Sequence, residues 1–130
     1  MLYISEDKDG GEVVNLTRGD DACLEVPMKN ADGEFYKMGE TEYLIFGVRR
    51  VPRLDSELLI SIESAPGSNR IIFSHADTAD QDVGEYSAEV QLMTAEGKRI
   101  TVWPLPQGRQ RIKENINRKN FVLMPEVVYT

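Results

Sequence analysis

The chain has 130 residues, of which 41% are hydrophobic and 28% charged, and this length and composition fit one globular domain with a packed core. Its 15 basic and 22 acidic residues give a formal net charge of −7, so a nucleic-acid backbone would be repelled overall. Cys23 is the single cysteine, which excludes an internal disulfide and favours a reducing compartment. Neither a signal-peptide pattern nor about 18 consecutive apolar residues occurs, so we expect no membrane association.

Apolar and polar side chains alternate with period two along most of the chain, which is typical of half-buried strands. The pattern predicts eight short strands, at residues 14–17, 23–28, 43–48, 58–62, 71–73, 86–92, 100–103 and 121–124. We expect the first two to form a hairpin, with turn chemistry at residues 30–33 just after them. Turn signals recur about every 8 to 12 residues, as in an all-β sandwich or barrel.

Little else in the sequence favours helix. A single turn is expected at residues 76–80, where Asp77 and Thr78 can cap it, and a weak candidate lies at residues 111–117. Residues 1–12 are predicted to form a solvated N-terminal arm, and residues 13–130 one domain.

One short motif indicates how the strands are arranged. Asp82, Gly84 and Tyr86 precede an alternating strand and resemble the Asp-x-Gly-x-Tyr sequence at the tyrosine corner of immunoglobulin-like sandwiches. The cysteine that follows this tyrosine in antibody domains is replaced by Ala88, so the likeness concerns architecture only. We therefore predict an immunoglobulin-like β-sandwich of about seven to nine antiparallel strands.

The candidates for catalysis are weak. His75 is the only histidine, so any relay with Cys23 or Ser74 as nucleophile would run through it. No nucleophile elbow or oxyanion segment accompanies these residues, and a histidine with a structural role in a turn is the better interpretation. No catalytic residue is predicted, and we expect the chain not to be an enzyme.

No metal or cofactor is expected either. Residues 5–10 place acids at the third and fifth positions and glycine at the sixth, as in a calcium loop, but the twelfth position is Leu16, where the loop needs Glu. The chain lacks a Gly-rich phosphate loop, and no Cys or His pair has zinc spacing.

Charge is unevenly distributed. Residues 109–119 hold five basic side chains and one acidic, against ten and 21 in the remainder. These basic residues are the candidate partner-binding residues: Arg109, Arg111, Lys113, Arg118 and Lys119. The segment is open to three interpretations: a solvated loop, a contact with an acidic neighbouring protein, or a nucleic-acid contact, which the lack of interleaved aromatic residues disfavours.

Trp103 also has two interpretations. It lies on a predicted strand, where core packing is natural. An exposed tryptophan could instead stack on a sugar, which would suit a carbohydrate-binding or cell-surface adhesion module built on a sandwich.

Several short motifs follow one another along the chain. They are, in order, Leu16-Thr17-Arg18-Gly19-Asp20-Asp21, Asn30-Ala31-Asp32-Gly33-Glu34, Gly39-Glu40-Thr41-Glu42-Tyr43, Phe46-Gly47-Val48-Arg49-Arg50, Ile72-Phe73-Ser74-His75-Ala76-Asp77-Thr78, Gly84-Glu85-Tyr86, Val90-Gln91-Leu92-Met93-Thr94-Ala95-Glu96-Gly97 and Phe121-Val122-Leu123-Met124-Pro125-Glu126-Val127. In this order, over about residues 13–128, they resemble the small immunoglobulin-like domains of phage and prophage structural proteins from Gram-positive bacteria. The likeness is greatest to the N-terminal domain of baseplate upper proteins.

The resemblance implies a tail or baseplate component that packs against other tail and baseplate proteins and performs no chemistry. It also implies synthesis in the bacterial cytoplasm and a final place in the virion. Self-association of the chain is left open by the sequence.

Overall fold

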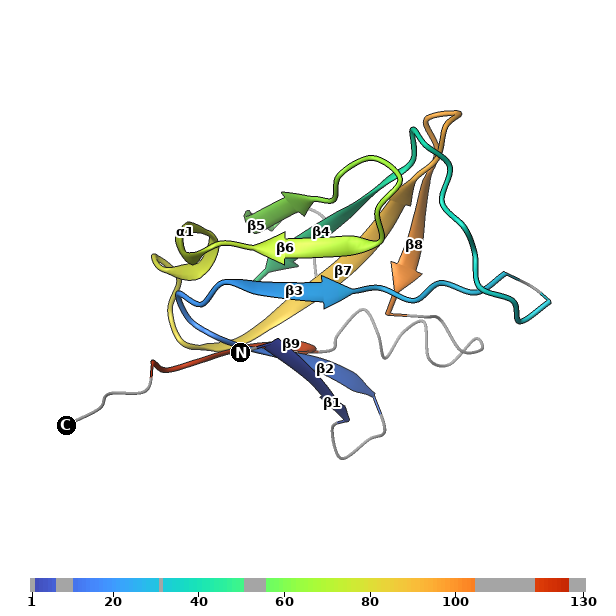
Figure 1. The fold of residues 1–130 in the computed structure, drawn as a ribbon. Coiled ribbons are helices and arrows are strands. Elements are labelled where there is room, and N and C mark those ends of the chain that lie inside the picture. Colours follow the sequence, from blue (N-terminus) through green and yellow to red (C-terminus); the bar gives the residue numbers. More distant parts are fainter. Residues whose placement is uncertain (1, 7–10, 31, 51–55, 105–118, 127–130) are drawn as a thin grey trace.

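The computed structural model describes residues 2–6, 11–30, 32–50, 56–104 and 119–126, and within these ranges it contains nine strands and one short helix (Figure 1). The strands are β1 Leu2–Glu6, β2 Glu12–Thr17, β3 Ala22–Glu25, β4 Tyr43–Arg49, β5 Leu58–Glu63, β6 Arg70–Phe73, β7 Gly84–Met93, β8 Arg99–Trp103 and β9 Phe121–Met124. The helix is α1, His75–Thr78.

The strands form two sheets. The larger has seven strands in the order β1-β2-β9-β7-β4-β5, with β8 also paired to β7, and the smaller consists of β3 and β6 (Figure 1). In an immunoglobulin-like sandwich, β3 and β6 take the places of strands B and E, β4 and β5 those of C and C′, and β7 that of F. The prediction of an all-β, immunoglobulin-like sandwich is confirmed.

All eight predicted strands are present, and the turn expected at residues 76–80 is α1, where the Asp77 carboxylate accepts a hydrogen bond from the Ser74 N–H (2.7 Å). The helix candidate at residues 111–117 lies outside the described residues. One pair departs from the antiparallel prediction: β2 runs parallel to β9, with Val14 opposite Phe121 and Leu16 opposite Leu123.

Two other predictions are wrong. The first two predicted strands do not form a hairpin, because β2 pairs with β1 and β9 in the large sheet while β3 pairs with β6 in the small one. The arm predicted for residues 1–12 is instead a strand over Leu2–Glu6, antiparallel to β2. Leu2 is half-buried and packs against the core, which gives this segment a reason to join the sheet.

Aromatic rings join the two sheets. Phe46 on β4 is fully buried and meets Phe73 of the small sheet edge-on, with ring centroids 5.3 Å apart. It also contacts Phe121 on β9, at 5.7 Å, and Trp103 on β8, at 6.4 Å. Because such rings each bury a large apolar area, this cluster supplies much of the hydrophobic contact between the sheets.

The strand beside β7 is split into two pieces. β4 occupies one edge of β7, so β8 and β9 must share the other: Trp103 lies opposite Val90, and Phe121 opposite Tyr86. Asn120 fills the position between them, and its side chain is 1% exposed.

The side chain of Asn120 replaces a missing strand neighbour. Its Oδ1 accepts a hydrogen bond from the Ala88 N–H (2.7 Å), and its Nδ2 donates to the Ala88 carbonyl (2.9 Å). The Asn120 N–H donates to the carbonyl of Tyr86 (3.0 Å). One amide group thus satisfies both buried backbone groups of Ala88, which the gap in the strand would otherwise leave unpaired.

We expect Asn120→Ala to lower the free energy of unfolding by about 2 to 4 kcal/mol, because two buried backbone groups lose their partners at once. Asn69→Ala is the matched control, since Asn69 is half-buried and donates one side-chain hydrogen bond, to the Val26 carbonyl (3.1 Å). That change should cost about 1 kcal/mol. Urea unfolding monitored by fluorescence gives both values, and equal losses would contradict the role given to Asn120.

Candidate functional site

The residues of the predicted tyrosine corner are brought together. The hydroxyl of Tyr86, at the start of β7, donates a hydrogen bond to the backbone carbonyl of Asp82, as the tyrosine of such a corner does. Gly84 between them has a φ of +146°, a backbone conformation that favours glycine. The guanidinium of Arg50 lies 4.5 Å from the centre of the Tyr86 ring and 3.6 Å from the Asp82 carboxylate. These contacts fix the corner and are structural.

A second ion pair closes the same end of the sandwich. Arg18, just after β2, makes two hydrogen bonds to the carboxylate of Glu126, at 2.8 and 3.1 Å, and donates a third to the Gln81 carbonyl. The guanidinium holds the pKa of Glu126 below its ordinary value, chiefly through these hydrogen bonds. The segment after β9 is therefore tied to the end of β2.

His75 has a structural contact. Its Nδ1 lies 2.7 Å from the carbonyl oxygen of Gly19, and its backbone N–H donates to the Asp21 carboxylate (2.9 Å). The hydroxyl of Ser74, the candidate nucleophile, donates to the Asp77 carboxylate. His75 therefore holds the turn between β2 and β3 against α1, which is the structural role that the sequence favoured.

Trp103 is a core residue. Its side chain is 9% exposed, its ring stacks on Phe46 with an angle of 17° between the planes, and its Nε1–H donates to the Glu12 carboxylate (3.0 Å). The interpretation of Trp103 as core is confirmed, and an indole buried in this way offers no stacking platform to a sugar.

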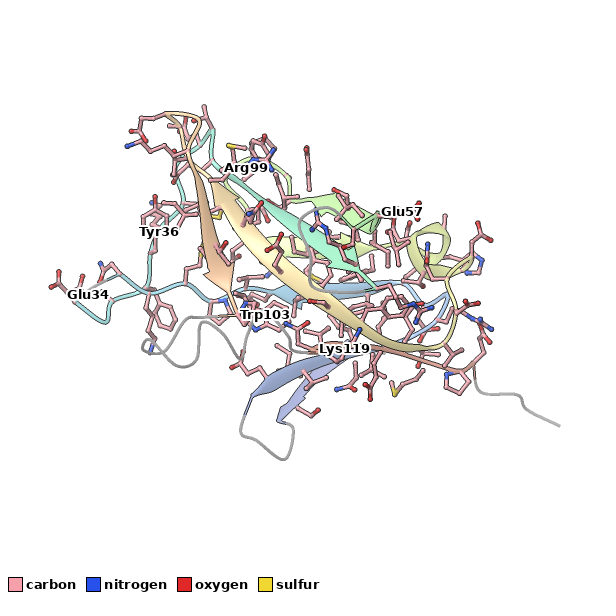
Figure 2. All side chains as sticks on the ribbon, turned by 180° about the vertical axis from the view of Figure 1, so that it is seen from behind. Glu34, Tyr36, Glu57, Arg99, Trp103 and Lys119 are labelled. Carbon is pink, nitrogen blue, oxygen red and sulfur yellow. The ribbon has the colours of Figure 1, made fainter. Side chains whose placement is uncertain are left out.

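Of the candidate partner-binding residues, the structure describes Lys119 alone, and Arg109, Arg111, Lys113 and Arg118 lie outside the described residues. Lys119 is half-buried, and its ammonium group donates to the backbone carbonyl of Arg50. Figure 2 labels Trp103, at the end of β8, and Lys119, the last residue of the basic segment. Trp103 at the end of β8 and Phe121 at the start of β9 lie opposite Val90 and Tyr86, which are four residues apart on β7, roughly 14 Å. β8 and β9, the strands before and after the basic segment, therefore lie along one edge of β7.

The connection between β3 and β4 projects from one end of the sandwich, with Glu34 at its tip and Tyr36 nearer the strands (Figures 1 and 2). It is held by Glu42, which is 7% exposed although it carries a carboxylate. Glu42 Oε1 accepts hydrogen bonds from the Tyr36 hydroxyl (2.6 Å) and from the Gly39 N–H (2.8 Å). The two bonds close the base of this loop onto the start of β4.

These hydrogen bonds shift the pKa values of Glu42 and Tyr36. The Tyr36 hydroxyl and, second, the Gly39 N–H hold the pKa of Glu42 below its ordinary value of 4.5. The same hydrogen bond raises the pKa of Tyr36, because the carboxylate favours the protonated phenol. Sequence reasoning did not single out either residue; a carboxylate immediately before a predicted buried strand was the only available signal.

Comparisons with known proteins assign no relative to this chain. No match to this chain is found among protein-family models, curated proteins or solved structures. Across residues 2–6, 11–30, 32–50, 56–104 and 119–126, no group of three or more His, Cys, Asp or Glu side chains could hold a metal ion. No helix in this part of the chain is long and apolar enough to cross a membrane. Residues 7–10 of the calcium-loop candidate lie outside the described residues. The hydroxyl of Ser5, its first position, accepts a hydrogen bond from the side-chain amide of Asn15.

We expect acid to destabilise the native chain more than the Glu42→Gln variant. Because the pKa of Glu42 is lower folded than unfolded, its ionised form stabilises the fold above pH 4.5, and this contribution is lost as the pH falls through the folded pKa. Glutamine keeps an acceptor for Tyr36 and Gly39 but does not titrate. Thermal unfolding midpoints from pH 7 to pH 3 should fall less steeply in Glu42→Gln, and parallel curves would contradict the assignment.

Proposed function

We propose that this chain is a non-enzymatic structural protein of a phage or prophage, a tail or baseplate assembly component that acts through contacts with neighbouring proteins. The order of its sequence motifs and its immunoglobulin-like sandwich both support this proposal. The surface feature that best supports assembly through protein contacts is the open edge of β6.

The ladder between β3 and β6 determines which backbone groups reach that edge. The Val26 N–H donates to the Asn69 carbonyl (2.9 Å), and in an antiparallel pair such hydrogen-bonded positions alternate. Leu24 and Ile71 are therefore hydrogen-bonded partners, whereas Ile72, opposite Cys23, points its N–H and carbonyl away from β3.

Nothing in the described part of the chain pairs with this side of β6, since β3 is its only strand partner there. The side chain of Ile72 is 65% exposed, while its neighbours Ile71 and Phe73 are buried. An open strand edge with an exposed apolar side chain is a template for strand addition by another protein, a common mode of assembly.

The basic segment is a second proposed contact. An acidic chain that collects five of its 15 basic residues within residues 109–119 offers one positively charged region to an acidic neighbour. The alternative of a carbohydrate-binding module depended on an exposed Trp103, and the buried position of that ring removes its support.

We expect Ile72→Pro to prevent incorporation of the chain into tail assemblies while leaving it folded. Proline removes the outward N–H of residue 72 together with the exposed apolar side chain, takes no hydrogen bond from the ladder with β3 and is tolerated on edge strands, so the free energy of unfolding should fall by at most about 1 kcal/mol. Ile72→Thr is the matched control, because it removes apolar surface but keeps the N–H. The readout is co-purification with tail proteins from induced lysates.

If Ile72→Pro co-purifies as well as the control does, the edge of β6 is not the contact. If the unmodified chain itself associates with no tail protein, the proposed function is wrong.

We also expect the triple reversal Arg109→Glu, Arg111→Glu and Lys113→Glu to weaken co-purification with tail proteins, most clearly at low salt, because the attraction to an acidic surface becomes repulsion. Folding should be intact by circular dichroism. Unchanged co-purification at all salt concentrations would show that this segment contacts no acidic partner.

A further inference from the structure

The outer part of the β3–β4 loop is a small hairpin built around one asparagine. The Asn30 side-chain oxygen accepts hydrogen bonds from the N–H groups of Asp32 (3.0 Å) and Glu34 (3.1 Å). The Asn30 N–H donates to the Glu34 carbonyl (2.8 Å), and Gly33 takes a φ of +80°. Six backbone groups therefore take part in the hydrogen bonds of this turn: the N–H groups of residues 30, 32, 33 and 34 and the carbonyls of residues 30 and 34.

The hairpin has two different sides. Lys29 and Phe35 form an antiparallel bridge, so their side chains lie on the same side of it. Next to them, the Tyr36 N–H donates to the Met28 carbonyl (2.9 Å). Met28 is buried in the core and Tyr36 is tied to Glu42, so this second pair faces the body of the protein. Lys29 and Phe35 therefore face outward.

Phe35 is the most exposed large apolar side chain in the described part of the chain, at 74%. A single exposed apolar residue needs no explanation when it lies on an ordinary surface. Here, however, the backbone beneath it is held by the Asn30 turn and by Glu42, so ordering this loop would cost little on binding. A rigidly presented aromatic ring is the usual anchor of a protein–protein interface.

Lys29 determines which chemistry a partner surface needs beside the Phe35 ring. Its ammonium nitrogen lies 5.5 Å from the centre of the Phe35 ring, so a cation lies over one face of the ring. The rest of the Phe35 side chain is open to solvent. A surface complementary to this pair has an apolar pocket for the ring and a carboxylate at its rim for Lys29.

We propose that Phe35 is an anchor that inserts into an apolar pocket, with an acidic side chain at its rim, on a neighbouring protein of the assembly. This inference rests on the proposed function, but it concerns a different surface from the β6 edge and names the chemistry of the partner.

The contact can be identified by replacing Phe35 in the full chain with the photoreactive residue p-benzoylphenylalanine and irradiating the assembly in induced cells. The same replacement at Ile72 is the comparison, since both side chains are well exposed. We expect the cross-link from position 35 to join one tail protein, at apolar residues with Asp or Glu beside them. A cross-link to a second copy of the chain, or cross-links scattered over many proteins, would overturn the proposal.

Binding to the purified cross-linked protein then measures the contribution of the ring. Phe35→Ala should weaken binding at least about 30-fold, the loss expected of an anchor residue, and leave the thermal midpoint of the free chain unchanged. Ile72→Ala should bind this same protein as the native chain does. Lys29→Glu should weaken binding about 10-fold, with a larger effect at low salt than at high salt.

Two results separate the failure of this inference from the failure of the proposed function. If the chain associates with tail proteins but Phe35→Ala binds within about threefold of the native chain, Phe35 is not the anchor and the function is retained. If position 35 cross-links to a pocket of the stated chemistry on a protein unrelated to tails, the anchor is retained and the function is wrong.

Discussion

The large sheet depends on the pairing of one side-chain amide, that of Asn120, with the backbone N–H and carbonyl of one residue, Ala88. β8 ends at Trp103 and β9 begins at Phe121, and Asn120 supplies both hydrogen bonds that Ala88 requires between these points. A buried peptide group without partners is expensive, so a strand interrupted at this place needs such a substitute. With it, β9 can continue the line of β8 along β7, and β2 and β1 can add to β9 in turn. Two separate strands, β8 and β9, thereby line one edge of β7 within a single sheet.

The two ends of the sandwich are fixed in different ways. At the end that carries α1, the Tyr86 hydroxyl, the Arg18–Glu126 pair and the contact between His75 and Gly19 tie turns and the end of β9 to one another. At the other end, the carboxylate of Glu42 closes the base of a loop whose outer side chains remain in solvent. The contacts at the first end therefore hold the turns and strand ends together, whereas the loop at the other end presents exposed side chains on a fixed base.

Period-two alternation predicted the strands well because it reports which face of each strand is buried. It carries no information about neighbours, so the parallel pairing of β2 with β9 and the separation of β2 from β3 were beyond its reach. Asn120 has no recognisable pattern either, because its importance comes from the gap it fills. Phe35 follows a predicted turn, where sequence does not distinguish an exposed aromatic ring from a buried one. The tyrosine-corner residues could be found because that motif is local.

The proposed contacts differ in kind and in place, and this bears on how an assembly component works. The β6 edge offers backbone hydrogen bonds on the small sheet, which are largely independent of side-chain identity. Phe35 offers an exposed side chain on the β3–β4 loop, which projects from the sandwich (Figure 1), and there pocket shape determines the partner. A protein that packs between neighbours needs at least two separate surfaces, and contacts that are individually weak become strong when geometry lets them form together. A general contact at one surface and a selective one at another would let a small domain both join an assembly and occupy a defined position within it.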